Sequence, residues 1–329
     1  MQVVALSCGN GGKEAQDFIH KVFMPHLQGF LTAEGEDAGV FEARGALALS
    51  TDSFVVDPPI FKGGDIGKLC VCGSANDVAM QGAHPEYLSV GFILEEGLEV
   101  ALLQEILASM QAQLRLGGLK LLSLDTKVVP KGCVDQIFIN TTALGPVLYP
   151  HLSAKNLKEG QVIIVSGAIG THGAVLFSQR AEIQLDTPLV SDCQQLYPLL
   201  EPVFQSGCKL HALRDATRGG LASVLHEWAQ SSGVGIEVEE DCIPILEGVR
   251  GVCEILGLEP FMLANEGVCV LCVEAKDARQ VCALLQEGGA KKACVIGEVV
   301  AGRGVTLKTP WGSKRPLDIL EGELLPRIC

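Results

Sequence analysis

Long apolar runs are missing from this sequence, and so are the marks of export. No run of 18 apolar residues occurs among its 329 residues, so no membrane-spanning helix is predicted. The opening MQVVALSCGNGG lacks the basic region and the long apolar stretch of a secretory signal peptide. We therefore expect a cytoplasmic protein with no membrane segment.

Positive charge is also scarce. The chain has 25 lysines and arginines against 39 aspartates and glutamates, which gives a formal net charge of −14. Such an acidic balance argues against extended binding to nucleic acid or to an anionic membrane surface, because both ligands are polyanions. It leaves room for a single locally basic pocket that binds a phosphate group.

The common metal and nucleotide motifs are absent. Cys269 and Cys272 form one C-x-x-C, but a zinc site of this type needs a second pair, and VCVLCV is typical of a buried strand. We interpret most of the 13 cysteines as small buried hydrophobic residues of a reducing compartment. There is no G-x-G-x-x-G, and in KGGDIGKL the residue Leu69 replaces the Ser or Thr of a Walker A motif. Any nucleotide site must be of a less common kind.

The length and the hydrophobic content of 48% favour two domains with sizeable cores. Strand-like and helix-like patterns alternate in both halves, which predicts an α/β (α+β) fold. A strand-like segment ends at Gly145 and Pro146, so we place an N-terminal domain at 1–150 and a C-terminal αβ domain at 151–310. Residues 311–329 are rich in proline and show little periodicity, so we expect a mobile tail.

Acidic residues recur in small polar clusters that follow apolar, strand-like runs. The five are Asp52, Asp77, Asp125, Asp215 and Glu266. A helix cap or a turn explains any one of them alone. Five together favour a site, because several converging carboxylates repel each other unless a cation lies among them. Hard oxygen ligands indicate Mg²⁺, which usually also binds phosphate oxygens.

Glycine-rich segments and lysines accompany these acids. The N-terminal GNGG, residues 9–12, offers backbone N–H groups that suit a phosphate. Lys62 and Lys68 flank the glycines of KGGDIGKL, and Lys127 follows Asp125 closely. Each segment is weak support by itself, but together they are consistent with a phosphate-binding site.

Taken together, these motifs resemble the family of aminoimidazole ribonucleotide synthetase, selenophosphate synthetase and thiamine-phosphate kinase. Within it they are most similar to the HypE family of hydrogenase maturation factors, and the resemblance covers essentially the whole chain. The motifs are STDSFVVDP (50–58), GGDIGKL (63–69), ANDVAMQGA (75–83), GFILEEGL (91–98), DTKVV (125–129), VSDC (190–193), LRDATRGG (213–220), RGVCEILGL (250–258), ANEG (264–267) and the terminal PRIC (326–329).

The resemblance implies an ATP- and Mg²⁺-dependent enzyme of two αβ domains, which forms a homodimer through the sheet of its N-terminal domain. It implies that Cys329 carries the substrate. The partner HypF places a carbamoyl group on this sulfur, the enzyme dehydrates the carboxamide to a thiocyanate, and the HypC–HypD complex receives the cyano group on iron for [NiFe] hydrogenase.

The resemblance also implies roles for site residues. Asp52, Asp77 and Asp125 would bind Mg²⁺, and Lys127 would neutralise the transferred phosphoryl group. Glu266 would be the base for the nitrogen protons, with His172 as a second candidate that has a structural turn role as its alternative. The expected nucleotide-binding residues are Gly9, Gly11, Gly12, Asp65, Lys68, Asn76, Thr126 and Asp215.

Some positions depart from the family pattern. Cys8 and Asn10 replace the histidine and the serine of its glycine loop, Leu124 replaces a glycine, and Thr171 replaces an aspartate. Two other functions therefore stay open. Cys8 and Lys13 are compatible with a selenophosphate synthetase, which uses a reactive N-terminal cysteine and lysine. Leu124, if it narrows the phosphate site, is compatible with a maturation scaffold that presents its tail without turnover.

Overall fold

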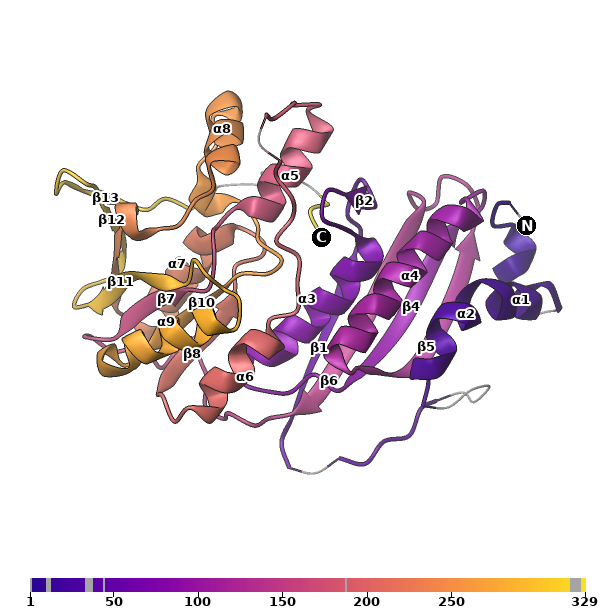
Figure 1. Cartoon of the computed structure of the whole chain (residues 1–329), viewed down its shortest axis with the longest axis horizontal. Helices are drawn as coiled ribbons and strands as arrows, with labels where there is room; N and C mark the ends of the chain where they lie inside the picture. The colour runs from indigo at the N-terminus through magenta and orange to yellow at the C-terminus, as the bar shows by residue number, and fades with distance from the viewer. Residues whose placement is uncertain (1, 10–12, 33–37, 44, 187, 320–326) are drawn as a thin grey trace.

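Two αβ domains lie side by side in the computed structural model, as the sequence predicts (Figure 1). The structure describes residues 2–9, 13–32, 38–43, 45–186, 188–319 and 327–329. A four-stranded sheet in the order β1-β6-β4-β5 forms the N-terminal domain, and a seven-stranded sheet in the order β13-β12-β9-β11-β7-β10-β8 forms the C-terminal domain.

The elements of the N-terminal domain are α1 (Lys13–Phe18), α2 (Met24–Leu27), β1 (Leu47–Phe54), β2 (Ile60–Phe61), β3 (Gly64–Asp65), α3 (Ile66–Met80), β4 (Tyr87–Glu95), α4 (Val100–Gly117), β5 (Lys120–Val129) and β6 (Ile137–Pro146). Those of the C-terminal domain are β7 (Val162–Val165), α5 (Thr171–Arg180), α6 (Tyr197–Gln205), β8 (Leu210–Asp215), α7 (Gly220–Ser232), β9 (Gly235–Glu239), α8 (Glu247–Leu256), β10 (Cys269–Val273), α9 (Ala278–Glu287), β11 (Cys294–Val300), β12 (Gly304–Lys308) and β13 (Lys314–Pro316).

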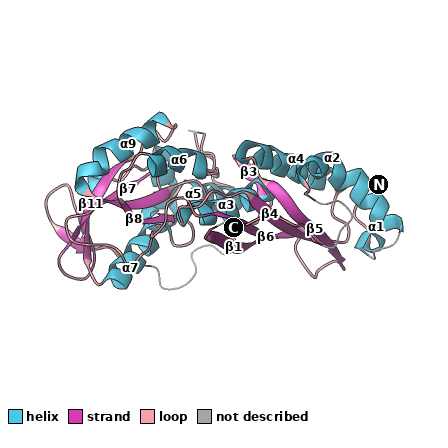
Figure 2. Ribbon diagram, turned by 90° about the horizontal axis from the view of Figure 1, so that it is seen from below, coloured by secondary structure: helices cyan, strands magenta, loops and turns pink. Residues whose placement is uncertain are grey.

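Helices cover one face of the N-terminal sheet (Figure 2). Alternate residues of a strand point to opposite faces, and in β4 the buried Leu88, Val90 and Phe92 face the helices while Ile93 is 37% exposed. In β1 the same alternation leaves Leu49 67% exposed. The other face of this sheet is therefore open in the part of the chain that the structure describes.

Helix α4 buries apolar residues that recur at the helical period, and it is capped by Gly118 in the left-handed conformation (φ 65°), as a glycine cap requires. Helix α3 differs from the prediction. The run CVCGSANDVAM is helical rather than a strand, and 13 of the 15 residues of α3 are buried. Asp77 therefore projects from a helix, and the expectation that it follows a strand is wrong.

The C-terminal sheet has the predicted apolar strands. β7 spans Val162–Val165, and β10 carries Cys269 and Cys272 fully buried, so this C-x-x-C is part of the core. Helices α7 and α9 each bury an apolar stripe, and Trp228 of α7 is buried in the core beneath the sheet.

The end of the chain corrects the predicted tail. β13 pairs with β12 and Leu317 is 2% exposed, so residues up to this point belong to the C-terminal sheet. Arg327, Ile328 and Cys329 lie between the two domains, next to α5 and β2 (Figure 1). Among the described residues, no helix combines the length and the apolar character that crossing a bilayer would require.

Candidate active site

The last three residues pair with the segment that follows β1. The Val55 N–H donates to the carbonyl oxygen of Cys329 at 2.9 Å, and the Asp57 N–H donates to that of Arg327 at 3.2 Å. Hydrogen bonds from every second residue, here 55 and 57, are the pattern of one strand that pairs with another. The chain end is thus docked on the N-terminal domain by its backbone, which any side chain at these positions would permit.

Helix α5 of the C-terminal domain contacts two of these residues, Arg327 and Ile328, from the other side. His172 Nε2 lies 2.9 Å from the Ile328 carbonyl oxygen, and its Nδ1 lies 2.8 Å from Ser191 Oγ. Arg180 Nη2 donates to the Arg327 carbonyl oxygen at 2.7 Å. Because both domains contribute donors, the docked chain end lies in the interface between them.

The Arg327 side chain makes contacts with the N-terminal domain that other residue types at this position could not make. Its Nε donates to the Val55 carbonyl oxygen at 2.8 Å, and its Nη1 lies 2.7 Å from a carboxylate oxygen of Asp135. The guanidinium also lies over the Phe138 ring, 5.6 Å from the centroid. Arg327 adopts φ 56°, a left-handed conformation that costs about 1 kcal/mol for a residue with a side chain. These contacts must offset that cost.

The Cys329 sulfur lies in an acidic, largely buried environment. Burial, with the charges of Glu266 and Asp52, raises the pKa of this thiol to about 11 against the lowering effect of Arg218. Arg218 Nη2 lies 3.6 Å from Sγ and lowers the pKa again. In this docked position the sulfur is a protonated thiol and therefore a poor nucleophile. Such a position suits the step after loading, when the sulfur already carries its substrate and no longer has to react.

Glu266 lies in the loop before β10. Its side chain is 3% exposed, and its Oε1 is buried with no hydrogen-bond partner among the described residues. Burial raises the pKa of Glu266 well above the ordinary value, with further contributions from Cys193, Asp215, Asp192 and Asp52. A carboxyl group with a raised pKa and an unused oxygen is a candidate general base.

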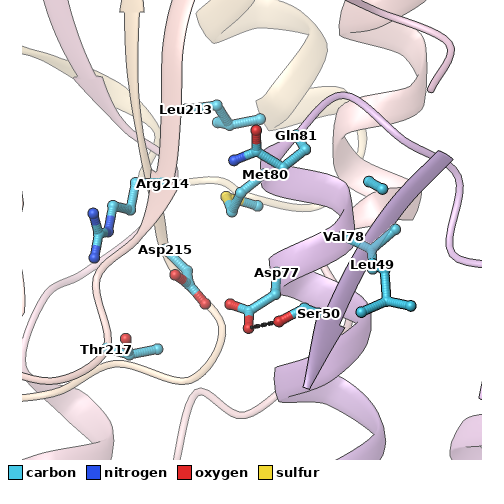
Figure 3. A pocket seen from close by; sticks show the side chains of 11 residues that line it. Leu49, Ser50, Asp77, Val78, Met80, Gln81, Leu213, Arg214, Asp215 and Thr217 are labelled. Atoms are coloured by element: carbon cyan, nitrogen blue, oxygen red, sulfur yellow. Dashed lines mark hydrogen bonds between the residues drawn. The ribbon is translucent and has the colours of Figure 1, made fainter. Parts of the chain in front are cut away.

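Asp77 and Asp215 face one another across a cavity of about 390 Å³ between the domains (Figure 3). Asp77 accepts a hydrogen bond from Ser50 Oγ at 2.6 Å. Burial raises the pKa of Asp215 to about 7, and the charges of Asp77 and Asp52 contribute. The three carboxylates therefore repel each other when they are ionised, and a cation near them would relieve this repulsion.

Asp125 does not join this group. It lies on β5, at the opposite edge of the sheet from Asp52 on β1, and three strand spacings separate these edges by about 14 Å. Asp125 is paired with Gly91, on the open face, whereas Asp52 faces α3. Over the described residues no three metal-ligating side chains gather at one point. The expected Asp52–Asp77–Asp125 site is not assembled within one chain.

Asp125, Thr126 and Lys127 line a second cavity of about 380 Å³ at the β5 edge. Cys8 and Gly9 of the glycine loop line its other side. A Cβ atom on Gly9 would lie 2.8 Å from the Val128 nitrogen, so only glycine allows the loop to lie this close to the strand. Gly11 and Gly12 lie outside the described residues.

Leu124 packs against the core on the helix-covered face, opposite Val90, and Asp125 points to the other face. Leu124 does not line the cavity of Asp125, Thr126 and Lys127 either, so the structure gives no support to the possibility that it narrows a phosphate site there. Thr171, the other departure, is the buried first residue of α5, and its hydroxyl hydrogen-bonds the Ala168 carbonyl oxygen at 3.4 Å.

Three residues that were expected to bind the nucleotide are instead hydrogen-bonded within the protein. Asp65 caps α3 by accepting the Lys68 N–H at 2.9 Å, and Lys68 Nζ donates to the Gly63 carbonyl oxygen at 2.9 Å. The buried amide of Asn76 donates to the Gln194 carbonyl oxygen at 3.0 Å and accepts the Leu196 N–H at 2.7 Å. Asn76 thus joins the two domains.

Two residues of the site, Arg180 and Asp192, were not predicted from the sequence. Arg180 lies on a helix whose apolar pattern gives no hint of its contact with the chain end. Asp192 belongs to the motif VSDC, but its contacts with the loop of Glu266 arise only from the fold.

Two family models match the chain. The model described as AIR synthase related protein, N-terminal domain, matches residues 35–147, and the corresponding C-terminal domain model matches residues 158–309. Residues 148–157 lie between the two matched ranges.

Relatives and solved structures align over nearly the full length. Carbamoyl dehydratase HypE of Escherichia coli (strain K12) is 46% identical and covers 100% of both chains. A crystal structure of the hydrogenase maturation protein HypE in complex with ATP is 40% identical, covers 99% of each chain and has a TM-score of 0.95. A HypE–HypF complex is 42% identical, covers 92% of this chain and 99% of that one, and has a TM-score of 0.81. The chain belongs to the HypE family within the AIR synthase related proteins.

Proposed function

We propose that this protein is an ATP-dependent carbamoyl dehydratase whose substrate is a carboxamide on its own Cys329 sulfur. One observation carries the proposal. The thiol of Cys329 is docked between the domains, next to the carboxyl groups of Glu266 and Asp52, whose negative charges raise its pKa. Family membership supports the same activity, because the E. coli relative is a carbamoyl dehydratase.

The chemistry requires oxygen to leave a carboxamide. Attack of the carboxamide oxygen on the γ-phosphate of ATP forms an O–P bond and releases ADP, and one N–H proton is lost. The C–O bond then breaks, inorganic phosphate leaves with that oxygen, and loss of the second N–H proton gives S–C≡N. The products are thiocyanate, ADP and phosphate, so the oxygen of the eliminated water ends in phosphate.

The residues around Cys329 suit the proton transfers. Glu266 has a buried, unpartnered oxygen that is free to accept a proton from nitrogen. Its raised pKa makes its ionised form a stronger base than an exposed glutamate. The Arg218 guanidinium, 3.6 Å from Sγ, places positive charge beside the carbon that loses its oxygen.

The carboxylates fit a magnesium ion. Asp52, Asp77 and Asp215 come from both domains, supply only hard oxygen ligands and repel each other when ionised. Among the described residues no three of these side chains gather at one point, so we propose that Asp77 and Asp215, which line the same cavity, hold Mg²⁺ together with phosphate oxygens of ATP, with Asp215 in place of the expected Asp125. When bound, the ion would neutralise charge on the phosphates of ATP.

A homodimer would bring the remaining predicted residues to the reaction. Asp125, Thr126 and Lys127 lie at the far edge of the sheet from Cys329, so one chain does not combine them with the docked tail. The open face of the N-terminal sheet exposes Leu49 and Ile93, which favours pairing with a second copy. We propose that the dimer forms through this face and that Lys127 of the second subunit neutralises the phosphoryl group.

The partners follow from the same role. A relative forms a HypE–HypF complex, and we propose that a HypF-type carbamoyltransferase loads Cys329. A HypC–HypD scaffold would receive the cyano group. A cytoplasmic location suits a carrier thiol, which must stay reduced to be loaded.

Mass spectrometry of the carbamoylated protein tests the proposal. Addition of Mg²⁺ and ATP should lower its mass by one water, at Cys329. A carbamoyl group that persists would instead support the non-turnover scaffold, and phosphate release stimulated by selenide would support a selenophosphate synthetase.

A further inference from the structure

The segment VSDC, residues 190–193, crosses the interface between the domains and has no role in the chemistry above. The Ser191 N–H donates to the Lys62 carbonyl oxygen at 2.8 Å, so the segment is fixed to the N-terminal domain. Gly63 lies against it, since a Cβ atom there would lie 2.8 Å from the Ser191 nitrogen. The segment is therefore a fixed support at the boundary of the site.

One carboxylate oxygen of this segment holds the loop that carries the base. Asp192 Oδ2 accepts three N–H groups, from the Asn265 side chain at 3.0 Å, the Glu266 backbone at 3.1 Å and the Gly267 backbone at 2.9 Å. Three donors on one carboxylate oxygen define the position of the loop closely. The backbone of Glu266 is thus placed by Asp192.

The loops also lie too close together for any residue but glycine at position 267. A Cβ atom on Gly267 would lie 1.9 Å from the Asp192 carbonyl oxygen and 2.7 Å from Gln194 Cγ. The close approach and the three hydrogen bonds are independent observations that fix the same relative position.

The same segment contacts the docked chain end. Ser191 Oγ hydrogen-bonds His172 Nδ1 at 2.8 Å, and His172 Nε2 hydrogen-bonds the Ile328 carbonyl oxygen at 2.9 Å. Adjacent residues of one segment therefore set the position of the tail and the position of Glu266. The distance between Cys329 and its base depends on this short stretch.

We propose that Asp192 is a positioning residue of the dehydration reaction, which holds the Glu266 loop in register with the tail that His172 docks. The proposal rests on the proposed function, in which Glu266 accepts the nitrogen protons. The remaining oxygen, Asp192 Oδ1, is buried with no hydrogen-bond partner among the described residues. An amide group can therefore replace the carboxylate without losing a contact.

Single-turnover dehydration of protein carbamoylated on Cys329 tests the proposal in three variants. Asp192→Ala removes the acceptor of all three N–H groups, and we expect a rate about 100-fold lower, the cost typical of a misplaced catalytic group. Asp192→Asn keeps an acceptor oxygen for the loop and should restore the rate to within about 5-fold of wild type. Gly267→Ala forces the loops apart and should be as slow as Asp192→Ala. Asp186→Asn, an exposed change on the same connection, is the matched control.

The pH profile separates positioning from mere structural support. Cys193, Asp215, Asp192, Asp52 and Cys329 are the titratable groups that face Glu266 electrostatically. Asp192→Asn removes one of these negative charges, so the acid limb of the rate profile should move to lower pH. Thermal melting and alkylation of Cys329 report whether each variant folds and docks its tail.

The outcomes discriminate clearly. A wild-type rate in Asp192→Ala or in Gly267→Ala overturns the proposal. So does an Asp192→Asn variant that folds, docks its tail and is as slow as Asp192→Ala. If Asp192→Ala does not fold, the rates of Asp192→Asn and Gly267→Ala test the positioning role of Asp192 without it. Failure of the wild-type protein to dehydrate its carboxamide would instead refute the proposed function and is seen in the same experiment.

Discussion

His172 Nε2 and the carbonyl oxygen of Ile328 lie 2.9 Å apart, although 156 residues separate them in the chain. A carbonyl only accepts, so Nε2 carries the proton, and Nδ1 must accept from Ser191 Oγ. Burial lowers the pKa of His172, which keeps the ring neutral. Both nitrogens are therefore used in holding the chain end, and His172 suits tail docking better than proton abstraction.

Loss of the Arg327 anchor should release Cys329. Arg327→Ala removes the contacts with Asp135, Val55 and Phe138, and an undocked thiol should recover a pKa near 8.5 from about 11. The thiolate fraction at pH 8, and with it the rate of alkylation by iodoacetamide, should then rise about 100-fold. Arg303→Ala, at an exposed position, is the control. Equal rates in wild type and Arg327→Ala would show that Arg327 does not hold the tail.

Glu266→Gln should stop proton transfer without disturbing the fold. The amide has nearly the same shape but accepts no proton, so we expect single-turnover dehydration to fall by about 10²–10⁴-fold. Binding of ATP, measured by calorimetry, should stay within a factor of about three. Because the pKa of Glu266 is raised, the wild-type rate should increase with pH as the carboxyl group ionises. A Glu266→Gln variant with an unchanged rate would assign the base elsewhere.

Asp215→Asn should stabilise the metal-free protein at alkaline pH. The folded pKa of Asp215 is about 7, above the ordinary value of 3.8, so the folded state binds more protons than the unfolded state between these values. Stability is therefore lost as the pH rises through this interval. The neutral variant avoids the loss, on the order of 2–4 kcal/mol above pH 7 and nothing near pH 3. Urea unfolding in a chelator at both pH values measures it.

Magnesium with ATP should stabilise the wild-type protein and have less effect on Asp215→Asn, because the ion relieves the repulsion that the variant lacks. Equal stability of the two proteins at alkaline pH in the chelator would contradict the repulsion. Equal stabilisation by Mg²⁺ and ATP would remove Asp215 from the proposed ion site.

A charge on the open sheet face should break the proposed dimer. Leu49 and Leu116 are each 67% exposed, but Leu49 lies on β1 at the open face and Leu116 on α4 at the other side of the domain. Leu49→Glu should give monomers in sedimentation velocity, whereas Leu116→Glu should stay dimeric. The monomer should also dehydrate slowly, because no second subunit then supplies a Lys127 to the docked tail. A dimeric Leu49→Glu would place the interface elsewhere.

An amphipathic helix is predictable because its half-buried face repeats apolar residues at the helical period, as in α4. Strand β7 is predictable for another reason, since it is a short continuous apolar run that is buried almost throughout. Helix α3 was not predictable as a helix, because it is buried on nearly every side and has no polar face that would show a helical period. Asp77 was accordingly expected at a strand end.

The site was predictable where chemistry is local to a motif. Glu266, Asp52, Asp77 and Cys329 interact through electrostatics that link both domains, and their motifs indicated a common site. The separation of Asp125 was not predictable, because strand order and side-chain parity decide it. Asp192 contacts Glu266 across 74 residues, and no spacing in the sequence announces that contact.

The fate of the carboxamide oxygen tests the central claim most directly. Cys329 is loaded with a carbamoyl group that carries heavy oxygen, and one turnover is run with Mg²⁺ and unlabelled ATP, with Cys329→Ala as the blank. If ATP activates the carboxamide, the label leaves the C-terminal peptide and appears in inorganic phosphate, in equal amount to the thiocyanate formed. Thiocyanate formed with the label in water, or a label that stays on Cys329 while ATP is hydrolysed, would contradict the account.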